Sequence, residues 1–167
     1  AKTQAPTDVG RLIVNSAADN VSVDSVLTLR EAMLAAKGSA IGGWSAGEQA
    51  QMPACVFNGS GDIIGGCGAG TQEMIVFDSG LGGAPTFALF SSLPIIDDSN
   101  SLIIDGGTVF PILDGGAMPG GTDILIITSD GNSVSNLSII NSPRHGVRIE
   151  SANNTLSGIF ASNNLGS

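Results

Sequence analysis

The tail of the chain repeats itself at an offset of 22 residues. GNSVSNLSIINS at 131–142 aligns with NNTLSGIFASNN at 153–164, so Asn132 meets Asn154 and Asn141 meets Asn163. A period in the low twenties is typical of one coil of a parallel β-helix, which stacks like residues on like. Asparagines that recur at one bend can hydrogen-bond along such a stack. The repeat therefore favours a β-solenoid over an antiparallel sandwich, the other all-β fold open to this sequence.

Short apolar runs between turn residues make up the chain from Met74 onward. The runs are rich in Ile, Val, Leu and Phe, as β-strands are, and they lie at 74–77, 86–90, 93–96, 101–105, 110–114, 123–128, 136–140, 146–150 and 155–160. The segments between them are too short for the crossover helices of βαβ units. We therefore predict one all-β domain over 1–167, with its coils at 74–167.

One helix is expected, within residues 1–38. Thr28 and Glu31 form the T-x-x-E pattern of a capping box, in which each side chain satisfies the backbone N–H of the other residue. The apolar residues that follow share one helical face; they are Leu29, Ala32, Met33 and Ala36. Because so short a helix cannot stand alone, we expect it to cover the N-terminal opening of the first coil.

Residues 39–73 are rich in glycine and show neither a strand period nor a helix period. We interpret them as an insertion loop, and a loop of this length is usually functional or pinned covalently. Cys55 and Cys67 lie within it, at a spacing that suits neither a zinc site nor a redox motif. We expect a disulfide between them, which implies an oxidising, extracytoplasmic compartment; two unrelated thiols are the alternative.

The charge of the chain limits its partners. Fifteen acidic and six basic residues give a net charge of −9, and no Lys or Arg lies between Lys37 and Arg144. Nucleic acids bind a basic surface, so they are excluded as partners, and an anionic membrane surface is disfavoured for the same reason. No apolar run is long enough for a transmembrane helix. A neutral surface glycan and divalent cations are compatible with such a surface.

The N-terminal segment resembles a known family. LTLREAM at 27–33, preceded by VNSAADN at 14–20, resembles the CSLREA motif of secreted bacterial right-handed parallel β-helix proteins, whose fold is pectate-lyase-like. The family's order continues with MIVFDSGL, SSLPII, SLIIDGG, GNSVSNLSIINS and HGVRIES. The resemblance implies a right-handed β-helix with an N-terminal capping helix, in an exported protein of the surface or adhesin type. Leu27 and Thr28 replace the motif's Cys and Ser, so the usual bridging role of that cysteine is absent.

One group of residues suggests catalysis. Asp97 and Asp98 could act as acid and base beside Arg144, His145 and Arg148, since polygalacturonases share the β-helix fold and use clustered aspartates with a His and an Arg. However, D-D-S-N is a turn sequence, and G-V-R-I is typical of an ordinary strand entry. We therefore interpret these residues as turn and coil residues, with catalysis as the alternative.

Calcium is the cofactor that the sequence suggests. Asp105 and Asp114 each open a D-G-G triplet, nine residues apart, a pattern similar to calcium-binding nonapeptides. Such sites need many stacked copies, whereas two D-G-G bends are explained by the tolerance of Asp and Gly for left-handed backbone. We expect turns at both positions and no bound cofactor.

Two classes of function stay open. The first is a non-catalytic secreted or cell-surface β-helix with a structural, adhesive or assembly role. The second is a carbohydrate-active enzyme (a polysaccharide lyase or glycoside hydrolase) or a fragment of one. The first is favoured, because no acid/base pair is convincing and aromatic residues that could stack on sugars are few. Since nothing after Gly158 resembles a second cap, we expect the rest of a longer chain or another subunit to cover the C-terminal coil.

Overall fold

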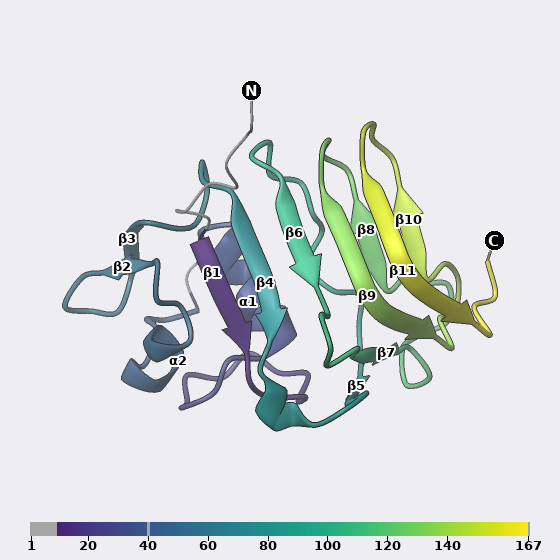
Figure 1. The fold of residues 1–167 in the computed structure, drawn as a ribbon, viewed down its shortest axis with the longest axis horizontal. Coiled ribbons are helices and arrows are strands. Elements are labelled where there is room, and N and C mark those ends of the chain that lie inside the picture. Colours follow the sequence, from purple (N-terminus) through teal and green to yellow (C-terminus); the bar gives the residue numbers. More distant parts are fainter. Residues whose placement is uncertain (1–9, 40, 167) are drawn as a thin grey trace.

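A computed structural model describes residues 10–39 and 41–166, so residues 1–9, 40 and 167 of the predicted single domain lie outside the described part. The chain is a parallel β-solenoid of about three turns (Figure 1). The predicted all-β parallel β-helix with an N-terminal helix is confirmed. The elements are β1 (Gly10–Val14), α1 (Leu29–Ala36), α2 (Ala46–Ala50), β2 (Val56–Phe57), β3 (Ile63–Gly65), β4 (Glu73–Phe77), the 3-10 turn η1 (Ser79–Leu81), β5 (Thr86–Ala88), β6 (Leu102–Asp105), β7 (Ile112–Asp114), β8 (Leu125–Ile127), β9 (Ser133–Ile140), β10 (Val147–Ile149) and β11 (Thr155–Ser162).

Parallel strands of the described residues stack in three columns. The first column runs β1, β4, β6, and then the first halves of β9 and β11. The second runs β5, β7, and then the second halves of β9 and β11. The third pairs β8 with β10 and is extended by a bridge between Ile96 and Ile127. The hydrophobic core lies between the three columns.

A stack of inward-facing side chains in the first column shows how the core is built. Leu12, Ile75, Ile104, Val134 and Leu156 occupy the same register position in five successive strands. The first four are at most 2% exposed, whereas Leu156 is 39% exposed. Burial of one aliphatic side chain contributes about 1.5–3 kcal/mol, so each coil stabilises its neighbour until the last one.

The corner between the first and second columns recurs at one register position. Ala84, Phe110, Asn136 and Gly158 occupy it, each with a φ between 52° and 60°. This left-handed conformation suits Gly and Asn better than Ala or Phe. At this corner the Asn136 amide donates a 2.8 Å hydrogen bond to Asp105 Oδ1. The shared corner keeps successive coils in register.

The predicted 22-residue repeat is confirmed. β9 and β11 pair in the register Ser133 to Thr155, an offset of 22 residues. A ladder of asparagine side chains accompanies it: Leu102 N donates to Asn132 Oδ1 at 2.7 Å, and Asn132 N donates to Asn154 Oδ1 at 2.9 Å. The ladder satisfies backbone N–H groups at the corner that precedes the first column.

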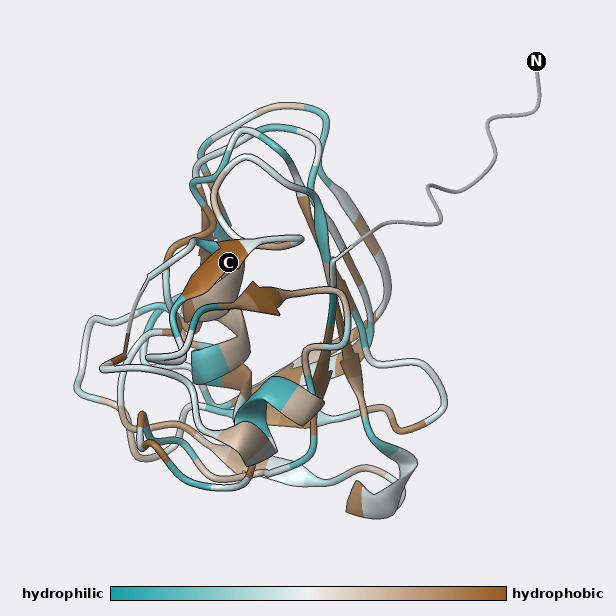
Figure 2. Ribbon diagram, turned by 90° about the vertical axis from the view of Figure 1, so that its left-hand side faces the viewer, coloured by the Kyte–Doolittle hydropathy of each residue, from teal (hydrophilic) through white to brown (hydrophobic). Residues whose placement is uncertain are grey.

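The N-terminal end of the solenoid is closed by α1, as predicted. Thr28 and Glu31 form the expected capping box. The helix contacts β1 and β4 and buries Leu29 and Met33, which are 2% and 1% exposed. Figure 2 looks along the solenoid from this end, where α1, α2 and their loops lie across the stacked coils.

The prediction that 39–73 is a loop is wrong, because the segment contains α2, β2 and β3 and ends in the first residue of β4. Ser45 and Glu48 form a second capping box that starts α2, and β2 pairs with β3 as an antiparallel hairpin. The predicted Cys55–Cys67 disulfide is confirmed. The apolar run 93–96 forms no strand: Leu93 N and Ile96 N donate to Ile124 and Ile126 of the next coil, but Pro94 between them has no N–H to continue a ladder.

Candidate functional site

The structure divides the candidate catalytic residues between two places. Asp97 and Asp98 follow Ile96 and lie against α1, where Asp97 Oδ1 is 3.0 Å from Lys37 Nζ. His145 and Arg148 lie on the third column instead, where both contact Asp123. The predicted constellation is therefore not one site, because Asp97 and Asp98 line the space beside α1 whereas His145 and Arg148 surround Asp123.

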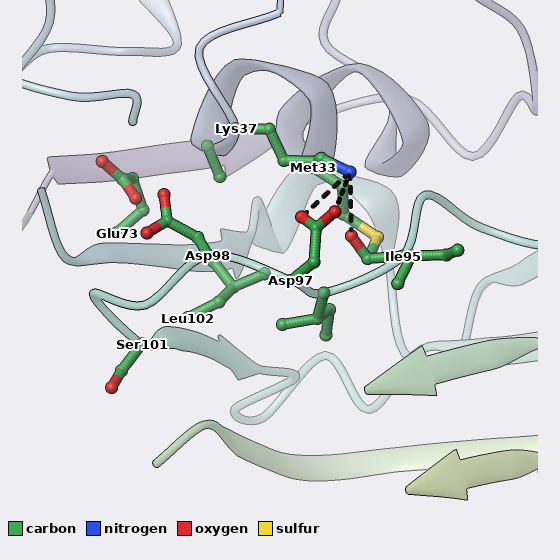
Figure 3. A pocket seen from close by; sticks show the side chains of 10 residues that line it. Met33, Lys37, Glu73, Ile95, Asp97, Asp98, Ser101 and Leu102 are labelled. Carbon is green, nitrogen blue, oxygen red and sulfur yellow. Dashed lines mark hydrogen bonds and ion pairs between the residues drawn. The ribbon is translucent and has the colours of Figure 1, made fainter. Parts of the chain in front are cut away.

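The first place is a small cavity beneath α1, which we call the α1 pocket (Figure 3). Its apolar wall comes from Met33, Ala36, Ile95, Ile96 and Leu102, and its polar residues are Lys37, Glu73, Asp97, Asp98 and Ser101. Lys37 also donates a 3.2 Å hydrogen bond to the Ile95 carbonyl. This ammonium group therefore ties the end of α1 to the coil below it.

Glu73 is the most perturbed acid of the α1 pocket. It is 2% exposed, and its Oε1 accepts hydrogen bonds from Gly68 N, at 2.7 Å, and from the Thr71 hydroxyl. Burial raises the pKa of Glu73 to about 7 against the opposing effect of these two hydrogen bonds, and the negative charge of Asp98 adds to the rise. Figure 3 shows the carboxyl groups of Glu73 and Asp98 facing one another.

A carboxyl group of raised pKa beside a second carboxylate is the arrangement of a glycosidase acid and base. The cavity has a volume of only about 10 Å³, which is room for about one water molecule. A wider hollow of about 590 Å³ opens beside it, lined by Lys37, Ala69, Gly70 and residues 97–100, but not by Glu73. Of the two carboxyl groups that face one another, only that of Asp98 therefore lines the wider hollow.

The second place is a cluster of charges around Asp123, which we call the Asp123 cluster. Asp123 is 3% exposed, and its Oδ1 lies 2.9 Å from His145 Nδ1 and 3.2 Å from Arg144 Nε. Its Oδ2 lies 2.9 Å from Arg148 Nε, an ion pair without hydrogen-bond alignment. Arg148 also contacts Glu150. The cations of this cluster are therefore already paired within the chain.

Burial would raise the pKa of Asp123, but the His145 backbone N–H, the His145 ring and the charge of Arg144 together hold that pKa below its usual range. Sequence reasoning missed Asp123. The signal was present, because Asp123 precedes His145 by 22 residues, the period of the repeat. No nucleophilic hydroxyl is hydrogen-bonded to the His145 ring in the described residues. The ion pairs of the cluster join Asp123, just before β8, to residues in and next to β10.

The two candidate calcium residues are the last residues of β6 and β7, at different corners, where each side chain caps the turn that follows. Asp105 Oδ1 accepts hydrogen bonds from Gly107 N, the Ser135 hydroxyl and the Asn136 amide. Asp114 Oδ1 accepts from Gly116 N and from the Asn141 amide, each at 2.9 Å. Within 10–39 and 41–166, no three His, Cys, Asp or Glu side chains are grouped so that they could hold a metal ion.

None of the described helices is both long and apolar enough to cross a membrane. The longest of them, α1, covers the solenoid and spans eight residues. Comparison of the chain with models of known protein families, with curated proteins and with solved structures found no match.

Proposed function

We propose that this chain is a non-catalytic, exported β-solenoid with a structural, adhesive or assembly role, and that its C-terminal coil is covered by the rest of a longer chain or by another subunit. The observation that carries the proposal is the open end of the stack. In the described residues β11 pairs with β9 on one side and with no strand on the other. An unpaired strand edge over an apolar interior favours association with another chain segment.

The side chains of the last coil support this proposal. Leu156, Ile159 and Ala161 line an open hollow of about 270 Å³ together with Ile139 and Val147 of the coil beneath. Phe160 and Leu165 are 59% and 83% exposed. A cluster of exposed apolar residues around a strand edge is typical of an interaction surface. The charged side chains of the α1 pocket and of the Asp123 cluster, by contrast, form ion pairs within the chain.

Export is supported by the Cys55–Cys67 disulfide, since such bonds persist in oxidising compartments. The resemblance of LTLREAM at 27–33 to the CSLREA motif points the same way. We therefore place the chain with secreted β-helix proteins of the surface or adhesin type, at the cell surface or outside the cell.

A polysaccharide assay tests the non-catalytic part of the proposal. The purified chain is incubated with pectin, alginate and chondroitin, with and without calcium, and a known lyase serves as the positive control. We expect no release of unsaturated or reducing ends above a heat-treated sample. Product formation that disappears in Asp98→Asn would instead establish a carbohydrate-active enzyme, the alternative function, with Asp98 at its site.

A further inference from the structure

We infer that Asn58 and Gly59, at the tip of the β2–β3 hairpin, are a site of self-modification, where the chain cyclises to a succinimide that water opens to aspartate or isoaspartate. The inference goes beyond the proposed function and does not depend on it, because it concerns the chemistry of one side chain in the insertion. The hairpin extends beyond the stacked coils (Figure 1), and Asn58, Gly59 and Ser60 are all exposed. Water therefore reaches the reacting groups.

The reaction is an intramolecular attack of a backbone nitrogen on the side-chain amide of the preceding residue. The Gly59 nitrogen bonds to Asn58 Cγ and gives its proton to solvent. The Cγ–Nδ2 bond then breaks, and Nδ2 takes a proton and leaves as ammonia. Water opens the ring at either carbonyl: cleavage of the new Cγ–N bond gives aspartate, and cleavage of the original peptide bond gives isoaspartate. The sum is one water molecule consumed and one ammonia released, so no oxidant, reductant or cofactor is required.

The attacking nitrogen is free at this site. Asn58 is the only asparagine of the chain that precedes a glycine. Three aspartates also precede a glycine, and there each glycine N–H is bonded to a neighbouring coil: Gly106 N to the Ser135 carbonyl at 2.9 Å, Gly115 N to the Ile140 carbonyl at 2.9 Å, and Gly131 N to the Ala152 carbonyl at 3.3 Å. Gly59 N, in contrast, donates no hydrogen bond to residues 10–39 or 41–166. It can approach the side chain without breaking a contact of the fold.

The amide carbon under attack is polarised by the turn. Asn58 Oδ1 accepts hydrogen bonds from Ser60 N and Asp62 N, each at 2.9 Å. Two backbone N–H groups on one oxygen form an oxyanion hole, which stabilises the negative charge that Oδ1 acquires when the Gly59 nitrogen adds to Cγ. Asn58 Nδ2 donates a 2.9 Å hydrogen bond to Asp62 Oδ2. This bond holds the amide so that Oδ1, rather than Nδ2, faces the two donors.

Glycine at position 59 serves the reaction rather than the fold. Without a Cβ, the Gly59 nitrogen is unhindered and its backbone rotates freely. A Cβ added at Gly59 would meet no atom within 4 Å, and the φ of this residue lies outside the left-handed region. The folded hairpin therefore accepts alanine here, which makes Gly59→Ala a variant that separates the reaction from stability.

The product changes the hairpin. The hydrogen bond from Asn58 to Asp62 becomes a contact between two carboxylates, which repel each other. Isoaspartate also adds a methylene group to the backbone of the turn. Both changes weaken the pairing of β2 with β3, whereas the Cys55–Cys67 disulfide still joins the two ends of the hairpin.

Incubation of the folded chain in heavy-oxygen water at mildly alkaline pH tests the inference. Intact mass and peptide mapping follow position 58, with fragmentation that distinguishes isoaspartate from aspartate. We expect conversion there ahead of every other asparagine, with loss of ammonia and uptake of one heavy oxygen atom. Gly59→Ala should slow the conversion by at least about tenfold, because its methyl group hinders the nitrogen and restricts the backbone. Gly83→Ala is the matched control, since a Cβ added there also meets no atom within 4 Å, and it should leave the rate unchanged.

The reduced chain, unfolded in guanidinium chloride, is the reference for the effect of the turn. A folded chain that keeps its amide at position 58 while the unfolded chain loses it overturns the inference, because the turn would then protect the pair. Equal rates for the wild-type chain and Gly59→Ala overturn it as well, since the Gly59 nitrogen would not be the nucleophile. Asn58→Gln is the second variant. It places the amide one methylene group further from that nitrogen, and we expect no conversion at position 58.

Discussion

The N-terminal end of the solenoid is built from segments that do not repeat, whereas the C-terminal end is the repeat itself. At the first end α1, α2 and the disulfide-linked insertion lie over the coil that begins with β1. At the other end the chain passes through β11 and adds no further element in the described residues. The two ends of one fold thus differ in composition as well as in exposure.

Buried acidic side chains show how the two ends of the solenoid differ. Three of the four buried acids of the described residues lie toward the N-terminal end, namely Glu31, Glu48 and Glu73, which are at most 2% exposed; the fourth, Asp123, is 3% exposed and precedes β8. Each accepts hydrogen bonds from backbone N–H groups, as at the capping boxes of Glu31 and Glu48. Burial raises the pKa of Glu31 as well, although its hydrogen bonds to Thr28 and Ser22 oppose the rise. The closed end thus uses buried carboxylates that cap helices and turns, whereas the repeating coils use contacts between like positions, such as the asparagine ladder.

The largest expected loss of stability follows from a substitution at the closed N-terminal end. Met33→Asp places an unpaired charge between α1 and the coil beneath, and should cost about 3–5 kcal/mol of unfolding free energy. The counterpart is Leu156→Asp at the open end, which should cost less than about 1 kcal/mol in the monomer, because Leu156 is already 39% exposed. Urea denaturation at a dilution that keeps the chain monomeric measures both. Equal costs would show that the two ends are equally closed.

The second effect concerns the insertion. Replacing both Cys55 and Cys67 by Ser should lower the unfolding free energy by about 3 kcal/mol, since the bond closes a short loop in the unfolded chain. Reduction of the wild-type chain should give the same loss. Hydrogen exchange should increase in the insertion and stay unchanged in β11. Increased exchange in β11 would show that the bond supports the whole stack rather than its N-terminal end.

The third expected effect is a pH dependence of the unfolding free energy, which arises from Glu73 near the closed end. Because folding raises the pKa of Glu73 from 4.5 to about 7, the stability that its neutral form contributes is complete below pH 4.5 and is lost as the pH rises to about 7. Between pH 5 and pH 8 the wild-type chain should lose on the order of 2 kcal/mol through this residue. Glu73→Gln keeps an acceptor for Gly68 N and should lose correspondingly less over the same range.

The groups that face Glu73 define the control for this experiment. Asp98 lies opposite it, and Lys37 with Asp97 completes the polar side of the α1 pocket. Asp98→Asn should lower the pKa of Glu73 and therefore shift the loss of stability to lower pH. Asp105 and Asp123, whose pKa values are lowered, contribute only at pH below about 4. Identical pH profiles for the wild-type chain and Glu73→Gln would contradict the raised pKa.

The open end was easier to predict from the sequence than the closed end, for a physical reason. In a solenoid the contacts of one coil recur in the next. The 22-residue offset between Asn132 and Asn154 therefore predicted the register in which β9 and β11 pair. The helix α1 was predictable as well, since its capping box is local. The capping box of α2 is also local, but glycines surround it. The α1 pocket depends on Glu73 and Asp98, which the fold brings together from 25 residues apart, and no period links them.

The smallest effect compares two positions of the asparagine ladder. Asn132 is 1% exposed, and its side chain accepts from Leu102 N and donates to the Ser129 carbonyl, each at 2.7 Å. Asn132→Ala would leave the buried Leu102 N–H without a partner and should cost about 2 kcal/mol. Asn154 accepts from Asn132 N at 2.9 Å, but it lies in the last coil and is half-buried.

Water can therefore replace the Asn154 side chain, and Asn154→Ala should cost only about 0.5–1 kcal/mol in the monomer. Urea denaturation of the two variants gives the difference directly. Equal costs for the two variants would show that the Asn154 side chain is as well shielded from water as that of Asn132.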